Sequence, residues 1–486
     1  MRLPGRCRVV RKTHSNTQLP GLGVGVGPWS RLGLEFGVGV RGTAVAAILL
    51  ALVGCSEPYR GEPAYSPFAA SRPRPPVPEG PLDLEACLAV ARANRRSLRI
   101  ADRRVLIAKD RVSEGWATVL PKLQWDGRAS WRNNDPGGVF GGGAVVSGER
   151  DVRLSRLTLL VPIYDFGASP TRLGILHGEV EIAGLDADRA RQDLELAVRA
   201  AYFRVLEARK IQEVVDESIA VVERQLQIAK EFLSQGIVSR SDVLTAEVQL
   251  AERRQERILA QGNADLAVAT LNRAMGIDVT RPTEVRDVLE TGPWTGSFEA
   301  ALRAAIDARP DLRALAKQVE NQQDDYRATE ATLAPRFYGF GQYEVTSDRY
   351  QMNKDWWSGG IGVQWSIFDG GQTFAQLRRK KKEIAEAIDL HDERIDDVVL
   401  EVKEAHVSLV GAAERIPVAK KAVEQGEENL RVVNDQYKQG ILSSADVLRE
   451  EDRLSRAKSS CYRSLYDYQE ALARLIHAIG GAPPVK

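Results

Sequence analysis

The sequence predicts a mainly helical protein with a small β part, built from two tandem copies of one module. Three observations lead to this class: a repeat that covers most of the chain, stretches that alternate with the two-residue period of a strand, and long proline-free runs typical of helices. Each module is expected to run helix, β-hairpin, long helix, turn, helix. The 486 residues leave room for two such units.

The composition excludes several classes of protein. The 67 Lys and Arg residues are balanced by 66 Asp and Glu residues, so the net charge gives no support to nucleic-acid binding. Charged residues make up 27% of the chain and the mean hydropathy is -0.27, which excludes a multi-span helical membrane protein. Any contact with a membrane must therefore use another device.

Residues 1–54 are predicted to be a signal-peptide region, of which roughly the first 37 to 40 are interpreted as the result of a mis-set start codon. The apolar run from Thr43 to Val53 is shorter than the roughly 20 residues of a spanning helix. It leads into Leu52-Val53-Gly54-Cys55, the pattern of a bacterial lipobox. We therefore expect Cys55 to be the lipidated first residue of the mature chain, and the absence of an acidic retention signal at Ser56 favours anchoring in the outer membrane. An ordinary buried cysteine is the alternative.

Residues 55–81 are predicted to be a lipid anchor followed by a Pro-rich linker. The remaining cysteines of the mature chain, Cys87 and Cys461, both lie in helical patterns. An oxidising periplasm would permit a disulfide between them. The helical setting favours two unpaired cysteines, and the sequence leaves the choice open.

The repeat defines a first module at residues 82–277 and a second at 297–481, with a linker at 278–296 and a tail at 482–486. The early parts of the two copies are displaced by 214 residues and the later parts by 204. Matching positions are Glu85 with Glu299, Pro121 with Pro335, Asp165 with Asp369, and Gly236 with Gly440. The difference in displacement is assigned to a surface loop in the Gly-rich stretch Asn133–Arg150, including Gly141-Gly142-Gly143.

Each module is predicted to hold one hairpin, because apolar and polar residues alternate there. In the first copy one face carries Leu123, Trp125, Gly127, Ala129 and Trp131, and the other carries Gln124, Asp126, Arg128 and Ser130. The second copy alternates from Phe337 to Val345 and from Trp357 to Ile367. Aromatic residues gather near the strand ends, as they do at the interfaces of a transmembrane barrel. A soluble sheet with one solvated face is the alternative.

Long helices account for the rest of each module. Between Pro170 and Pro282 no proline occurs, and the helical pattern is interrupted only at Gly236, so two helices are expected. In the second copy one helix is expected from about Gln372 to Tyr437, which at 1.5 Å per residue is about 100 Å. Its apolar residues recur at spacings of three, four and seven, as in a coiled coil. Pro417 lies inside it and is expected to kink it.

Four strands per chain cannot close a barrel, and an open sheet edge in lipid leaves backbone groups unpaired at several kcal/mol each. Other subunits must then supply the missing strands. Two copies give 8 strands, too few for an open pore, whereas three give 12, inside the usual range. The sequence therefore predicts a homotrimer that shares one 12-stranded transmembrane β-barrel.

With these features in order and present twice, the chain from about Leu82 to Gly481 resembles the TolC-like outer-membrane efflux proteins. The residues that carry the resemblance are the Glu-Ala-x-Leu helix starts, the Leu/Ala-Pro strand starts, the Tyr/Phe-Asp-x-Gly strand ends and two Gly-Ile-x-Ser-x-x-Asp-Val-Leu turns. The resemblance implies the exit channel of a tripartite efflux or type I secretion system. Its partners would be a periplasmic adaptor and an inner-membrane pump of the RND, ABC or a similar class, and its location the outer membrane, extending into the periplasm.

The resemblance also implies roles for the two turns, which would lie at the periplasmic tips. Adaptor docking is assigned to Gly236, Ile237, Ser239, Gly440, Ile441 and Ser443. Gly at each turn suits a positive φ, and the serines suit helix caps. The periplasmic gate is assigned to Asp446, Tyr437 and Asp242: three copies of Asp446 would form a ring that favours cations, and Tyr437 would hydrogen-bond Asp242.

Two features leave the gate open to other interpretations. Asp242 is equally well explained as a first-turn acid favoured by the helix dipole. Arg449 and Leu442 depart from the family pattern, so the charge of the gate is not fixed by the resemblance.

No catalytic chemistry is expected. The sequence has no phosphate-binding Gly-x-x-x-x-Gly-Lys-Ser/Thr loop, no His-Glu-x-x-His helix and no Cys-x-x-Cys pair, so neither a cofactor nor a metal is predicted. A lipid-anchored helical scaffold of the periplasm that forms no channel remains the alternative function. It would explain Cys55 and the helical seams but not four alternating strands with aromatic ends.

Overall fold

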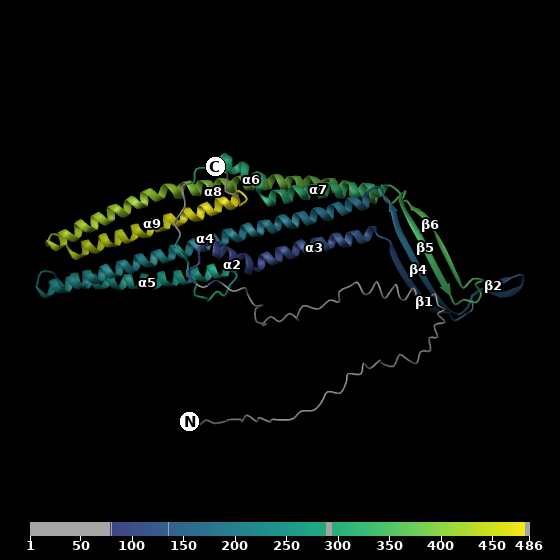
Figure 1. The fold of residues 1–486 in the computed structure, drawn as a ribbon, viewed down its shortest axis with the longest axis horizontal. Helices are drawn as coiled ribbons and strands as arrows, with labels where there is room; N and C mark the ends of the chain where they lie inside the picture. Colours follow the sequence, from purple (N-terminus) through teal and green to yellow (C-terminus); the bar gives the residue numbers. More distant parts are fainter. Residues whose placement is uncertain (1–77, 79, 135, 288–293, 482–486) are drawn as a thin grey trace, which may run out of the picture. The chain divides into compact units, whose positions relative to one another are not determined.

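The computed structural model describes residues 78, 80–134, 136–287 and 294–481. The predicted signal region, the lipidated Cys55 and the tail at 482–486 lie outside the described residues. Within them, the module that the sequence predicts occurs twice (Figure 1). The first copy contains the helices α2 (Leu84–Asn94), α3 (Arg96–Val119), α4 (Ala168–Ser234) and α5 (Arg240–Met275). The second contains α6 (Phe298–Ala308), α7 (Pro310–Glu330), the short 3-10 turn η1 (Ala331–Leu333), α8 (Gln372–Lys438) and α9 (Ser444–Ala478).

The segment before each hairpin is two helices, which corrects the single helix expected there. The break falls at Arg95 in the first copy and at Arg309 in the second, and both residues have extended backbone. Pro310 follows the second break and disfavours helical backbone at the residue before it. No proline follows Arg95, so the sequence pattern gives no warning of the first break.

Helix α8 lies within one residue of the bounds predicted for it, and the starts of both long helices have a clear cause. Both α4 and α8 contain 67 residues, or about 100 Å of helix at 1.5 Å per residue. Each begins after a glycine with positive φ. The carboxylate of Asp165 accepts the backbone N–H of Ser169, and that of Asp369 accepts the N–H of Thr373, both at 2.8 Å. The repeated Asp-x-Gly motif is therefore a helix-start device, and α8 continues through Pro417 as one helix.

The strands form one antiparallel sheet in the order β1-β4-β5-β6, made of β1 (Lys122–Trp131), β4 (Asp151–Tyr164), β5 (Arg336–Thr346) and β6 (Asp355–Gln364). Two modules thus share one sheet, with β4 and β5 at its centre. In the described chain, β1 and β6 are paired on one side only. A separate small hairpin, β2 (Gly137–Phe140) and β3 (Gly143–Val146), lies in the stretch expected to be a loop. Gly141 and Gly142 make its turn with positive φ, so only part of the Gly run is loop.

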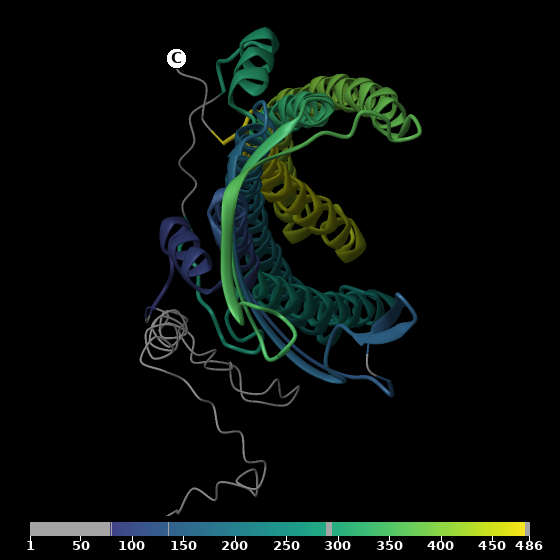
Figure 2. The same cartoon turned by 90° about the vertical axis from the view of Figure 1, so that its right-hand side faces the viewer.

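The register gives the sheet two different faces. The face called here the apolar face carries Leu123, Trp125, Trp131, Leu157, Leu159, Val161, Tyr343, Trp357, Ile361 and Val363. The opposite, polar face carries Lys122, Gln124, Asp126, Arg128, Arg156, Thr158, Arg336, Gln342, Glu344 and Ser358. On the apolar face Trp357 and Ile361 are 79% and 74% exposed. Figure 2, which looks onto the strand end, shows the sheet as a curved layer in front of the helices.

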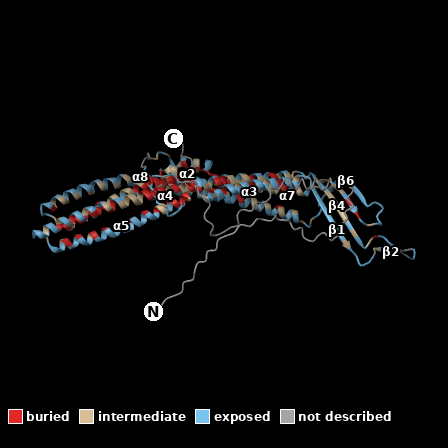
Figure 3. Cartoon of the chain, turned by 60° about the horizontal axis from the view of Figure 1, so that its bottom comes forward, coloured by how far each residue is buried: buried red, intermediate tan, exposed pale blue. Residues whose placement is uncertain are grey.

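The helices lie side by side in an order that follows the sheet. Helix α3 packs on α4, α4 on α7 and α7 on α8, while α5 packs on α4, and α9 packs on both α8 and α4. Buried residues concentrate in the helices, and the strands are largely exposed (Figure 3). One core forms where α2 meets α4 and α5, a second where α6 meets α8 and α9, and a third between α4, α5 and α9. Among the described helices, none is both long and apolar enough to cross a membrane.

Candidate functional site

The two turns between long helices, α4–α5 and α8–α9, lie together at the end opposite the sheet (Figure 1). Gly236 and Gly440 each have a φ of 74°, as predicted. Ile237 donates its N–H to the Phe232 carbonyl at 2.9 Å, and Ile441 donates to the Gln436 carbonyl at 3.0 Å. These bonds close the preceding helix in a Schellman motif, which requires a left-handed residue such as glycine. The same motif therefore ends both long helices.

The residues after each glycine begin the next helix with a capping box. Ser239 accepts the N–H of Asp242, whose carboxylate in turn accepts the Ser239 N–H at 2.9 Å. Ser443 and Asp446 repeat this arrangement, with a return bond of 3.1 Å. Ser443 is thus the N-cap of α9. Within one chain, both aspartates are first-turn acids that complete a capping box.

Asp446 has a further partner that Asp242 lacks. Its Oδ1 accepts a hydrogen bond from Arg449 at 3.0 Å. The hydrogen bonds from Ser443, together with Arg449, lower the pKa of Asp446. The carboxylate is therefore ionised at neutral pH, and a basic side chain lies directly beside it.

Tyr437 is buried in the last turn of α8, facing the first module. Its ring lies 5.8 Å from that of Phe232 in α4, which joins the two helical hairpins close to their tips. Burial raises the pKa of Tyr437, and the charge of Asp242 raises it further. Within the chain the Oδ2 of Asp242 is occupied by Ser239. A hydrogen bond between Tyr437 and Asp242 stays a prediction.

The turns also expose apolar side chains at the very end of the helices. Ile237 and Ile441 are 58% and 66% exposed, although a turn of this kind needs neither to be apolar. The structure thus brings the residues assigned to the gate and to the two turns to one end of the described chain. In the described ranges no group of three or more His, Cys, Asp or Glu is placed to hold a metal ion, and Cys87 and Cys461 are both unpaired.

The family model described as outer membrane efflux protein matches residues 88–277 and 301–481, one range within each of the two modules. The chain belongs to the outer membrane efflux protein family. The predicted family, the mainly helical fold class and the outer-membrane location are thereby confirmed, and the role of efflux channel is supported for the family as a whole.

Relatives of the chain are distant. It is 23% identical over 286 residues to the outer membrane efflux protein BepC of Brucella suis, and 24% identical over 269 residues to nodulation protein T of Rhizobium leguminosarum. These matches span 58% and 53% of this chain, and 62% and 57% of the relatives' own lengths.

The fold is shared with solved structures over a longer stretch. The Campylobacter jejuni CmeC outer membrane channel superposes with a TM-score of 0.71 at 15% identity, covering 82% of this chain and 85% of CmeC. At this identity the likeness shows the fold.

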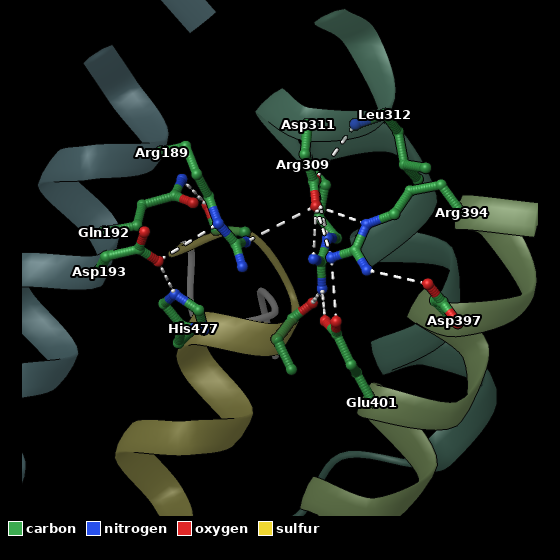
Figure 4. Close-up of polar contacts among 12 residues, drawn as sticks. Arg189, Gln192, Asp193, Arg309, Asp311, Leu312, Arg394, Asp397, Glu401 and His477 are labelled. Atoms are coloured by element: carbon green, nitrogen blue, oxygen red, sulfur yellow. Dashed lines mark hydrogen bonds and ion pairs between the residues drawn. The ribbon is translucent and has the colours of Figure 1, made fainter. Parts of the chain in front are cut away.

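Sequence reasoning missed a second polar site in this efflux-family chain, a charged cluster centred on Arg309 (Figure 4). The Arg309 side chain is fully buried at the break between α6 and α7. It donates to both carboxylate oxygens of Asp311 at 3.0 and 2.6 Å, to Glu401 of α8 at 2.6 Å, and to the Ala478 carbonyl at the end of α9 at 3.0 Å. One side chain therefore ties three helices together.

The cluster is completed by a second arginine and by groups of the first module. Arg394 donates to Asp311 and to Glu401, each at 2.9 Å. Burial alone would raise the pKa of Asp311, but the hydrogen bonds from Arg309 and Arg394 outweigh it and hold that pKa well below its usual range. Next to the cluster, His477 of α9 lies 2.6 Å from Asp193 of α4 (Figure 4).

The sequence did carry one signal for this site. Arg309 lies 214 residues after Arg95, which also stands at a helix break and donates to a helix-end carbonyl, that of Arg273, at 2.5 Å. Each module therefore has an arginine at the same repeat position that donates a hydrogen bond to a carbonyl at the end of the module's last helix. The repeat does not reveal the acidic partners of Arg309. The positions of the first module that match Asp311 and Glu401 are Ser97 and Ala197, and neither is acidic.

Proposed function

We propose that the chain is one subunit of an outer-membrane exit channel that passes substrates passively and is not an enzyme. It acts as a homotrimer in a tripartite efflux or type I secretion system. A periplasmic adaptor and an inner-membrane pump, of the RND, ABC or a similar class, deliver the substrate and supply the energy. The mature chain is held in outer-membrane lipid through Cys55 as well as through the sheet.

The observation that carries this proposal is the four-stranded sheet with an exposed apolar face. Strands that cross a lipid bilayer alternate apolar residues toward the lipid with polar residues toward the lumen. Charged residues on the apolar face, Asp151, Arg153 and Asp355, lie only near the strand ends that point away from the helices. A periplasmic scaffold has no use for such a face, so the sheet favours the channel.

The free edges of the sheet support the trimer. In lipid the outer edges of β1 and β6 need partners for their backbone groups, and a second copy offers the complementary edge. Three copies complete 12 strands. Just as β1 and β6 form the edges of the sheet, α3 and α8 form the edges of the helical layer. They expose apolar side chains, such as Ile107, Trp116, Leu400 and Val407, that are available for contacts between copies.

The tips are the proposed gate and docking region. Asp446, Tyr437 and Asp242 lie where the helices reverse, and the buried Tyr437 holds the two hairpins together. The exposed Ile237 and Ile441 next to Gly236 and Gly440 offer the adaptor an apolar contact at each turn, with Ser239 and Ser443 fixing the start of the next helix.

The test is conductance of the purified protein in a planar lipid bilayer, compared between wild type and Asp446→Ala. Loss of the Asp446 carboxylate opens the capping box of α9, so larger conductance steps and weaker block by cations are expected. Ser443→Ala, which opens the same capping box but keeps the Asp446 carboxylate, is the control that separates a loosened turn from a role of Asp446 itself. Absence of conductance from every variant would contradict the channel, and unchanged steps in Asp446→Ala would remove this residue from the gate.

A further inference from the structure

We propose that the polar face of the sheet makes the pore prefer anionic solutes. This inference rests on the proposed channel and names the class of solute that it favours. It starts from the charges on the two faces of the sheet, because the polar face is the one that lines the lumen when the apolar face contacts lipid.

The polar face carries more basic than acidic side chains. Lys122, Arg128, Arg156 and Arg336 are basic, and Asp126 and Glu344 are acidic, which leaves a net charge of plus two per chain. Glu344 accepts from Arg156 at 2.8 Å in an ion pair, whereas Asp126 accepts from the neutral amide of Gln124 at 2.9 Å and keeps its charge, which the net of plus two already includes. Glu344 is also buried, so its charge is neutralised by Arg156 and turned away from solvent.

Three of the basic side chains remain available to solutes. Lys122, Arg128 and Arg336 are exposed, and no ion pair joins them to another described residue. Lys122 and Arg336 are the first residues of β1 and β5, so both lie where the sheet joins the helices. The two positions are related by the 214-residue repeat.

In the proposed trimer, these two repeat-related residues form a ring. In a trimer, each copy contributes Lys122 and Arg336 at the same level of the barrel, which places six positive charges around the passage from the helical part into the barrel. Such a ring of basic side chains favours anions. At about 0.1 M salt the Debye length is about 10 Å, so the ring influences solutes that pass near the wall and loses influence as salt rises.

At the tips, the acid of the second turn is compensated by a basic neighbour. Asp446, the acid expected to favour cations there, is paired with Arg449 at 3.0 Å and so contributes no net charge together with its partner. The proposed preference for anions therefore rests on the three basic side chains of the sheet that have no ion pair with another described residue, Lys122, Arg128 and Arg336.

The test is the reversal potential of the purified protein in a planar bilayer under a KCl gradient, first at low and then at high salt. The wild type is expected to favour chloride over potassium, more strongly at low salt. The double variant Lys122→Gln/Arg336→Gln is expected to lose most of this preference, and Lys122→Glu/Arg336→Glu to reverse it. Arg153→Gln is the matched control, because it removes a positive charge from the apolar face of the same sheet and is expected to leave the reversal potential unchanged.

The outcomes are distinguishable from a failure of the channel itself. A conducting wild type that favours potassium, or a conducting double variant with an unchanged reversal potential, overturns the proposal and leaves the channel in place. An equal shift in Arg153→Gln also overturns it, because the face of the sheet would then not matter. Absence of conductance from all variants overturns the channel and this proposal with it.

Discussion

Replacement of Arg309 by alanine tests the cluster that joins α6, α7, α8 and α9. The variant removes hydrogen bonds to Asp311, Glu401 and the Ala478 carbonyl from a side chain with no exposed surface. Breaking a buried ion pair costs about 3 to 5 kcal/mol, because the remaining charges lose their partner without gaining water. Arg394 still neutralises Asp311 and Glu401, so we expect the lower end, about 3 kcal/mol.

The internal repeat supplies the control. Arg95→Ala removes the equivalent arginine of the first module, which is only half-buried and donates to the Arg273 carbonyl. Loss of a hydrogen bond of this kind costs about 1 kcal/mol. Arg309→Lys keeps the charge but loses the forked contact with Asp311, and its stability should lie between that of the wild type and that of Arg309→Ala.

The assay is thermal unfolding followed by far-ultraviolet circular dichroism in one detergent, with all variants scanned at the same rate because unfolding of such a protein need not be reversible. The melting temperature is expected to fall much further for Arg309→Ala than for Arg95→Ala. Equal falls would refute the reasoning, since they would mean that the acidic partners of Arg309 contribute nothing.

Three further predictions concern titration and reactivity. The hydrogen bonds from the arginines outweigh burial and lower the pKa values of Asp311 and Glu401. The stability that these two carboxylates contribute is therefore present above their ordinary pKa values of about 4 and is lost as the pH falls through the lowered values of the folded state. The melting temperature should therefore decrease below about pH 4, and it should decrease less in Asp311→Asn. Glu451 is buried beside a cavity of about 340 Å³ between α4, α8 and α9, and burial raises its pKa. The free-energy cost of ionising Glu451 in the folded state therefore grows as the pH rises above its ordinary pKa of about 4.3. Glu451→Gln should have a higher melting temperature than the wild type at neutral pH, and a lower one would contradict this. Burial raises the pKa of Cys87 to about 12, so a maleimide should label Cys461 before Cys87 in the native protein, and equal labelling would show that α2 opens readily.

Much of the fold follows from local rules that the sequence displays openly. The end of α8 was expected near Tyr437 and lies at Lys438, because Gly440 forces the turn and Ser443 caps the next helix. The alternation from Leu123 to Trp131 gave the correct faces of β1, since the period of a strand is fixed by its pleat.

Some of the features that were missed depend on partners far away in the chain, and others lack a local signal. Asp311 meets Arg394 only after α7 and α8 pack together, and no spacing within one segment announces that contact. The break at Arg95 has no proline to mark it, and the β2–β3 hairpin lies in a Gly-rich stretch whose strands are only 4 residues long. Packing between distant segments decides the charged cluster, whereas the hairpin pairs only neighbouring residues and is too short for its alternation to show.

The central claim is that a sheet with free edges at β1 and β6 is completed by other copies of the chain. The most direct measurement is the mass of the detergent-extracted protein by native mass spectrometry, on the full chain as the cell processes it. Three chains per particle are predicted, because three copies complete the 12 strands that close the sheet. A particle of one chain that remains folded would contradict the account, because its sheet would expose both edges to the membrane.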